Sequence, residues 1–266
     1  MKQGKMSLIA RKPLQIFLSV QKALFLRELG MRFSVSKSGL FWTFFEPFMQ
    51  VFVMVIIKII LFGKAGDNFD FAAFLALNFT AYNMFKNIIS KSMGSFTANK
   101  GLFVYKQVKP IDTIVARVMV EVFVTGIIIL AFIAIGAYFG FDLNIQNLPM
   151  VTFGFMWLII FSFSFGLFIA VSNTFYPSVG KVINISMIFL MFGSAVFYTI
   201  EMLPPQIQTF LLYNPLTHFM EMIHGYYFYV LDDGFIDYGY MVLWTLALLF
   251  SALWFYRRLE ERIISL

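Results

Sequence analysis

Residues 95–112 read SFTANKGLFVYKQVKPID and lie between two long apolar stretches of the chain. The segment carries three lysines, a glycine and a proline, so we expect it to lie in water between two membrane spans. It also places four consecutive apolar residues, 102–105, in that loop. Solvent-facing loops seldom expose so much apolar surface unless a partner covers it. Two interpretations stay open from these residues: a docking site for a soluble partner, or an ordinary lysine-rich cytoplasmic loop.

The composition indicates an integral membrane protein. The chain is 60% hydrophobic and only 13% charged, whereas soluble domains carry about a quarter charged residues. Its apolar residues fall into blocks of about twenty, the length that crosses a bilayer as a helix. We therefore expect an all-α membrane protein in which residues 1–266 form a single transmembrane domain. The absence of cysteine excludes disulfides and thiolate metal sites.

The apolar blocks predict six transmembrane helices. Residues 14–33 precede them and repeat apolar and basic residues at helical spacing, which predicts an amphipathic helix lying on the membrane surface. Residues 199–237 are too polar and too broken by proline and glycine to span the membrane. We expect short re-entrant helices at 199–230, buried in protein. The expected spans are 40–63, 71–89, 114–139, 150–171, 182–198 and 238–256.

The basic residues predict the orientation. All Lys and Arg residues except Lys58 and Lys64 fall on the side that holds both chain ends and residues 95–112. Basic residues concentrate on the cytoplasmic side of membrane proteins. We therefore expect both termini and residues 95–112 in the cytoplasm. The same distribution accounts for the net charge of +6, so we expect no nucleic-acid partner.

Polar side chains recur every three to four residues at the inner end of the second expected span. They indicate either the wall of a hydrated path for a polar, anionic cargo or the wet face of a helix that has left the membrane. Lys58, near the outer end of the first span, is expected to snorkel to the surface or to contact cargo. The residues of the polar stripe are Asn83, Lys86, Asn87, Ser90, Lys91 and Gly94.

Other side chains at the membrane boundaries are open to two interpretations. Glu46 caps the inner end of the first span or faces a gate. Trp42 and Phe45 belong to an interfacial aromatic belt or offer flat surfaces to a sugar polymer. Arg117 and Glu121 are four residues apart, and we expect them to pair as structural support at the inner boundary.

Sequence motifs for catalysis are missing. The chain has no G-x-x-x-x-G-K-[ST] phosphate loop, and no nucleophile triad or carboxylate pair is apparent. His218, Glu221 and His224 follow i, i+3, i+6 spacing. On a regular helix the two histidine side chains then point in directions that differ by roughly a third of a turn around the helix axis. We therefore expect no metal site. The spans show no series of buried acidic and basic residues of the kind that proton-coupled transporters use, and no inverted repeat is evident. A separate protein must therefore supply the energy if cargo moves uphill.

Several motifs resemble those of permeases of the second ABC exporter class. The N-terminal matches are REL at 27–29, RF at 32–33, GLFW at 39–42 and EP at 46–47. More specific matches resemble the permeases of bacterial capsular-polysaccharide exporters of the KpsM type. These are NKGLF at 99–103, VKPIDTI at 108–114, AR at 116–117, LP at 203–204, and YNPL at 213–216 with His218 and Glu221. The resemblance covers the whole chain.

The resemblance implies a homodimer that works with two copies of a separate ABC ATPase. ATP and Mg²⁺ would bind that partner, and this chain would hold no cofactor and catalyse no reaction. Residues 14–33 would form an interface helix, and residues 95–106 would form a coupling helix that docks on the ATPase. The cargo would be a lipid-linked, usually acidic polysaccharide. It would pass to an inner-membrane polysaccharide co-polymerase and an outer-membrane export protein.

We assign three sets of site residues. Leu102, Phe103 and Tyr105 are expected as apolar anchors in the ATPase. Lys100 and Lys106 are expected at the rim of that contact, with Asn99 and Gly101 beside them. The remaining sets are Arg27, Glu28, Arg32 and Glu46 for the interface helix and gate, and Trp42, Phe45, Lys58, Asn83, Lys86 and Asn87 for the cargo path.

The expected function is therefore that of a permease subunit in the bacterial inner membrane, serving an ATP-driven exporter of lipid-linked capsular polysaccharide. One alternative is the permease of an exporter for another glycolipid polymer, such as O-antigen or teichoic acid. A second alternative, from a different class, is a membrane scaffold or enzyme that has no ATPase partner.

Overall fold

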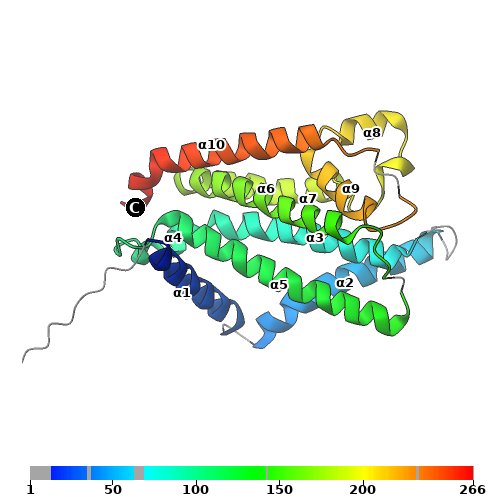
Figure 1. Cartoon of the computed structure of the whole chain (residues 1–266), viewed down its shortest axis with the longest axis horizontal. Coiled ribbons are helices and arrows are strands. Elements are labelled where there is room, and N and C mark those ends of the chain that lie inside the picture. Colours follow the sequence, from blue (N-terminus) through cyan, green and yellow to red (C-terminus); the bar gives the residue numbers. More distant parts are fainter. Residues whose placement is uncertain (1–12, 35–36, 63–68, 142, 232–233, 266) are drawn as a thin grey trace, which may run out of the picture.

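The computed structural model describes residues 13–34, 37–62, 69–141, 143–231 and 234–265. Within these ranges the chain folds into helices joined by turns, and no strand is present. Long helices run side by side along the longest axis of the molecule, with short helices at its two ends (Figure 1). This is the all-α architecture that the composition predicts.

The short helices cluster in two of the connections between long helices. The long helices are α1 (Pro13–Ser34), α2 (Lys37–Phe62), α3 (Phe71–Met93), α5 (Pro110–Phe139), α6 (Leu148–Phe175), α7 (Ser178–Phe192) and α10 (Tyr238–Ile264). The short ones are α4 (Ser95–Ala98) and η1 (Lys100–Leu102) before α5, then η2 (Ile200–Met202), α8 (Pro205–Leu211) and α9 (Pro215–Gly225) before α10.

The centre of the bundle is α3, which packs against α2, α5, α6, α7 and α9. Its Tyr82 and Phe85 side chains are among the largest fully buried ones. The helix begins at Asp70, whose carboxylate accepts the backbone N–H groups of Ala72 at 3.0 Å and Ala73 at 3.2 Å. These bonds satisfy two of the four free donors at a helix start, so the sequence fixes where α3 begins.

Four helices in the described part of the chain are long and apolar enough to cross a membrane: Phe41–Leu61 within α2, and the whole of α5, α6 and α10. The helix α7 is apolar but shorter. The helix α3 is long, but polar residues such as Asn83 and Lys86 lower its hydropathy. The multi-pass membrane character is therefore confirmed, whereas the number of six spans stays a prediction.

The fifth expected span, 182–198, differs from the structure at its end. The corresponding helix α7 stops at Phe192 and is followed by Gly193. Ala195 then adopts a left-handed backbone with φ of 55°, a conformation that L-residues other than glycine, asparagine and aspartate seldom adopt. The helix therefore cannot continue through this position, and the chain turns towards η2.

The third expected span, 114–139, begins earlier in the structure, at Pro110 of α5. Proline is well suited to the first turn of a helix, and the Asp112 carboxylate accepts the backbone N–H of Lys109 at 2.8 Å. The expected end of the first span at Gly63, Lys64 beyond it, and the basic N-terminal residues lie outside the described residues.

A side-chain bridge fixes the turn between α6 and α7. The Asn173 amide donates to the Met93 carbonyl at 3.1 Å and accepts the backbone N–H of Gly180 at 2.9 Å. A Cβ atom at residue 180 would lie 2.6 Å from the Asn173 Oδ1, so any other residue here would displace the Asn173 side chain from the bridge. The ends of α3, α6 and α7 are thus tied together at the end of the bundle where α4 lies (Figure 1).

The opposite end of the bundle is closed by α8 and α9, which lie together there (Figure 1). Every residue of α9 from Leu216 to Gly225 is buried. The Asn214 amide, at the start of α9, donates to the Gly193 carbonyl and to the Ser194 hydroxyl, both at 2.8 Å. These bonds hold the end of α7 against the start of α9.

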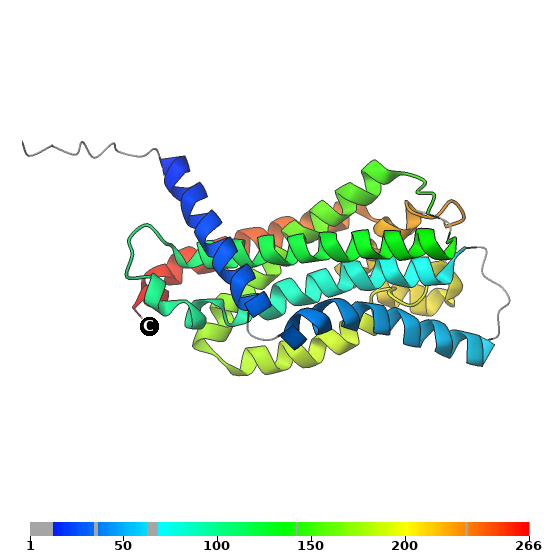
Figure 2. The same ribbon diagram turned by 90° about the horizontal axis from the view of Figure 1, so that it is seen from below.

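The N-terminal helix α1 lies obliquely across the α4 end of the bundle (Figures 1 and 2). It packs on α5 and α2. Leu24 is buried. Phe25 makes an edge-to-face contact with Phe123 of α5, with ring centroids 5.9 Å apart. Phe17 and Met31 belong to the apolar residues that recur at helical spacing in the expected amphipathic helix at 14–33, and both are exposed. Part of this apolar set is therefore directed away from the bundle.

Candidate coupling site

The segment expected as one helix at 95–106 forms two short helical turns, α4 and η1, followed by turns. The Asn99 side chain donates to the Ser95 carbonyl at 2.8 Å. Such a side-chain bond competes with helical backbone bonding. Gly101 follows, and glycine weakens a helix. Both residues therefore favour the break between α4 and the rest of the loop.

The apolar residues of this loop divide between the core and the surface. Phe103 is only 7% exposed, and Leu102 packs partly against the core. Val104 and Tyr105, by contrast, are 82% and 65% exposed. The prediction of Phe103 as an exposed anchor is therefore wrong, because its ring lies inside this chain. We call the exposed set the coupling surface; it comprises Lys100, Gly101, Val104, Tyr105 and Lys106.

Asn99 contacts α1 instead of forming part of the coupling surface. Its side chain is buried, and the Arg27 guanidinium donates to its Oδ1 atom. Asn99 thus joins the loop to the N-terminal helix. The two residues are 72 positions apart in the chain, so no local spacing rule pairs them.

Three more polar links connect α1 with α5, and we call them the α1–α5 ladder. They begin near the loop and continue along both helices in the same direction. Each link joins side chains that are buried or half-buried in the structure. The links are Gln21–Asp112 at 3.2 Å, Glu28–Arg117 at 3.3 Å, and Arg32–Glu121.

The expected pair of Arg117 with Glu121 is absent from the described contacts. Arg117 instead reaches Glu28 and also donates to the Lys91 carbonyl, while Glu121 pairs with Arg32. A pair within one helix contributes only a few tenths of a kcal/mol. The Glu121 side chain is 4% exposed, and a buried charge gains much more from a well-placed partner on a neighbouring helix.

A groove of about 610 Å³ lies between α1 and the loop. Ile16, Val20 and Leu24 line it from α1, and Leu102 and Val108 line it from the loop. This groove adjoins the coupling surface, so a protein that binds the loop would also contact α1. The site can therefore take an apolar side chain and a surrounding rim of polar contacts.

The residues assigned to the cargo path lie in separate places. Trp42 and Phe45 form an aromatic cluster with Phe41 at the start of α2, with ring centroids 4.7 to 5.7 Å apart. Lys58 lies 13 residues beyond Phe45, roughly 20 Å along the helix. Its amine is 3.8 Å from the ring centroid of Phe71. The structure therefore does not bring Lys58 together with the aromatic cluster.

Glu46 and Asn83 are connected through a residue that the sequence analysis did not single out. Gln50 donates to the Glu46 carboxylate at 3.3 Å and accepts the Asn83 amide at 2.8 Å. Lys86 and Asn87 are half-buried on the following turn of α3. The spacing of Glu46 and Gln50, one helical turn apart, is the signal that could have found this chain of polar groups.

His224 contacts Glu221, whereas His218 contacts neither of these two side chains in the described interactions. The His218 ring nitrogens face the Leu212 and Phe235 carbonyls at 2.9 and 3.1 Å. His224 lies 3.2 Å from Glu221 and 3.1 Å from Asn78, and Glu221 accepts the backbone N–H of Ile200 at 2.9 Å. Among the residues that the structure describes, no group of three or more such side chains could hold a metal ion.

Comparison with known proteins agrees with the resemblance seen in the motifs. The family model for the ABC-2 type transporter matches residues 20–228. The polysialic acid transport protein KpsM of Escherichia coli is 31% identical over 97% of this chain and 100% of its own length. The capsule polysaccharide export inner-membrane proteins BexB of Haemophilus influenzae and CtrC of Neisseria meningitidis are each 27% identical, over 88% and 87% of both chains.

Proposed function

Because the chain belongs to the ABC-2 type transporter family, we propose that it carries lipid-linked, acidic capsular polysaccharide across the bacterial inner membrane. It is the membrane-spanning permease subunit of an ABC exporter and not an enzyme. A separate ATPase subunit, present in two copies, binds ATP together with Mg²⁺ and hydrolyses the ATP. The missing phosphate loop in this sequence supports that division of labour.

The observation that carries the proposal is the coupling surface. Val104 and Tyr105 are neighbouring apolar residues on a water-facing loop, and they are more exposed than the buried Phe103 beside them. Apolar residues exposed together indicate a contact with another protein. We therefore keep Tyr105 as an anchor of the ATPase contact and assign Val104 in place of the buried Phe103, with Lys100 and Lys106 at the rim. Such rim charges contribute little to affinity.

The α1–α5 ladder supplies a route for force from that contact. When the ATPase moves the loop, Asn99 pulls on Arg27, and the ladder makes α1 follow α5. Because α1 leads directly into α2, the start of the first span shifts with it. This motion opens a path beside the aromatic cluster of Trp42 and Phe45 at the inner end of α2.

The permease works as a homodimer, with the path between the two copies. Two of the candidate spans, within α2 and α10, are only 11% and 17% buried against 56% for α6, so the bundle leaves apolar surface for a second copy. Both termini and the coupling surface lie in the cytoplasm, in keeping with the positions of the basic residues. After crossing, cargo passes to an inner-membrane co-polymerase and an outer-membrane export protein.

Co-purification tests the proposal directly. A tagged permease should bring down an ATPase that carries a Walker motif, and the double variant Val104→Asp, Tyr105→Asp should lose it. The matched control is Tyr229→Asp, Val230→Asp, because these two residues are equally large and well exposed at the opposite end of the bundle. Loss of the ATPase with the control, or its retention with the loop variant, would refute the assignment.

The nature of the polymer is tested separately. Lys86, half-buried on α3, favours anionic cargo over a neutral glycolipid polymer such as some O-antigens. Lys86→Gln should therefore reduce export of an acidic polymer more than export of a neutral one in reconstituted vesicles. An equal reduction of both would favour the exporter of another glycolipid.

A further inference from the structure

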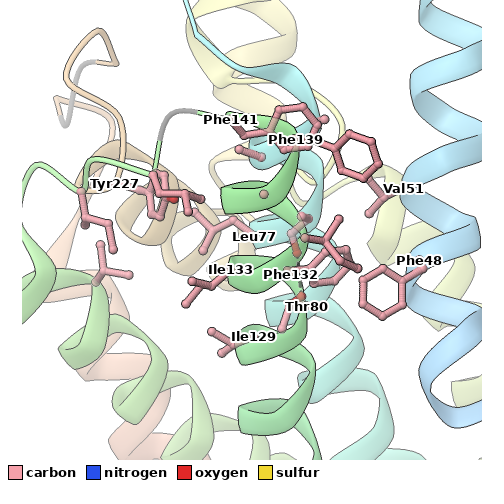
Figure 3. Close-up of a pocket in the computed structure, with 18 of the residues that line it drawn as sticks. Phe48, Val51, Leu77, Thr80, Ile129, Phe132, Ile133, Phe139, Phe141 and Tyr227 are labelled. Atoms are coloured by element: carbon pink, nitrogen blue, oxygen red, sulfur yellow. Dashed lines mark hydrogen bonds between the residues drawn. The ribbon is translucent and has the colours of Figure 1, made fainter.

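A large apolar cavity lies in the half of the bundle nearest α8 and α9. It has a volume of about 950 Å³, is partly open to the outside, and is lined by α2, α3, α5 and α6 together with Phe141, Leu143 and Ile145. Figure 3 shows Phe48 and Val51 of α2 directed across it towards Phe132 and Phe139 of α5. Its volume is near the upper end of the range of about 300–1,000 Å³ for ligand sites.

The lining offers almost nothing to water. Only Thr80, Thr152 and Tyr227 bring polar side-chain atoms to it. The hydroxyl of Thr80 donates to the Ala76 carbonyl at 2.6 Å, and that of Thr152 donates to the Leu148 carbonyl at 2.9 Å. Both hydroxyls are thus satisfied by their own helices. A water molecule in a cavity needs two to four polar partners, so the space suits hydrocarbon.

The part of the lining that α5 supplies runs ten residues along the helix, from Ile129 to Phe139, which is roughly 15 Å at the helical rise. At the inner end of the cavity the Phe48 and Phe132 rings meet with centroids 4.3 Å apart. Lys58 lies ten residues further along α2, roughly 15 Å at the helical rise. The hydrocarbon core of a bilayer is about 30 Å thick, so one leaflet contributes about half of it. A single extended acyl chain therefore fits between the ring contact and the membrane surface.

A lysine lies close to one part of the cavity lining. The Lys58 amine lies over the ring of Phe71, the residue before Ala72, which lines the cavity. A lysine at the membrane surface attracts anionic lipid headgroups. Lys58 is thus placed to meet the phosphate of a lipid whose chain enters the cavity.

We propose that this cavity binds one acyl chain of an anionic phospholipid from the leaflet at the α8–α9 end, with the lipid phosphate beside Lys58. The lipid is a resident of the permease and is distinct from the cargo. It fills a space that would otherwise leave the apolar lining without contacts. The proposal does not depend on the ATPase contact or on the identity of the polymer.

Photolabelling tests the proposal. The full chain is reconstituted in phosphatidylethanolamine vesicles with a small amount of phosphatidylglycerol that carries a photoreactive group on one acyl chain. Labelled peptides should map to α2, α3 and α5 around the cavity. In the variant Ala76→Phe, the added phenyl ring takes up part of the space that the acyl chain would fill. Loss of about two methylenes of contact would lower cavity labelling about tenfold. A second filling variant, Ala73→Phe, guards against a folding failure of the first.

The matched control is Ala247→Phe on the exposed surface of α10, which should leave cavity labelling unchanged. Lys58→Gln should remove an approximately fivefold preference for phosphatidylglycerol over phosphatidylcholine. Unchanged labelling in both filling variants, or an unchanged headgroup preference, would overturn the proposal. A third result would also overturn it: no labelling of the cavity, together with a disulfide between two copies that each carry cysteine at the exposed position 52. In that case the cavity would face a second copy of the protein and not a lipid.

Discussion

The Arg32–Glu121 link gives the sharpest test of the α1–α5 ladder. The Glu121 side chain is 4% exposed, whereas that of Arg32 is 17% exposed. Arg32→Ala therefore leaves a carboxylate buried without its partner, which costs about 3–5 kcal/mol. Glu121→Ala leaves an arginine that can still reach water, so we expect a smaller loss of about 1–3 kcal/mol. The asymmetry follows from the burial of the two side chains.

A double-mutant cycle separates the link from its surroundings. The free energy of unfolding is measured in mixed detergent micelles by titration with sodium dodecyl sulfate, followed by circular dichroism. The double variant should be less destabilised than the sum of the single variants by about 1–3 kcal/mol. Lys22→Ala, at an exposed position of the same helix, should change the stability by less than about 0.5 kcal/mol. Additive single effects would refute the link.

Three further predictions concern the loop, the polar chain and the closed end. Phe103→Ala should cost about 3–5 kcal/mol of stability by the same titration, because it empties a core position, while Tyr105→Ala should leave stability unchanged and weaken retention of the ATPase. Gln50→Leu should cost about 1–3 kcal/mol, because the Asn83 amide loses its acceptor; an unchanged unfolding curve would exclude that bond. Glu221→Ala should lower the stability by at least as much, because the buried backbone N–H of Ile200 loses its acceptor. Faster proteolysis of the connection between α7 and α9 would reveal this loss.

The long helices could be predicted from the sequence because a membrane span needs a block of apolar residues. The resemblance to capsular-polysaccharide permeases was also visible in short motifs and is confirmed by the comparisons. The end of α7 could not be foreseen, because Ala195 in a left-handed conformation leaves no mark in hydropathy. Propensity alone would continue the helix through this apolar stretch.

At the coupling site, sequence patterns did not predict which side chains are buried or which residues pair. Four apolar residues in a row, 102–105, have no periodicity that tells which side chain is buried, so Phe103 was placed on the wrong side. Arg117 was paired with Glu121 because spacing within one helix is all that a sequence displays. The actual partners come from α1, and only the folded chain brings them near. The spacing of Glu46 and Gln50 is visible in the sequence, but the contact of Gln50 with Asn83 is not, because Asn83 lies on another helix.

The Asn173 bridge has a mechanical consequence. It binds α3, α6 and α7 at a point next to the loop that precedes α5, and so makes that point a fulcrum. The helix α6 has 28 residues and extends roughly 40 Å from it. A tilt of one degree about this fulcrum would displace the far end by about 0.7 Å on that lever arm. A small movement near the Asn173 bridge is thus enlarged at the end of the bundle where α8 and α9 lie.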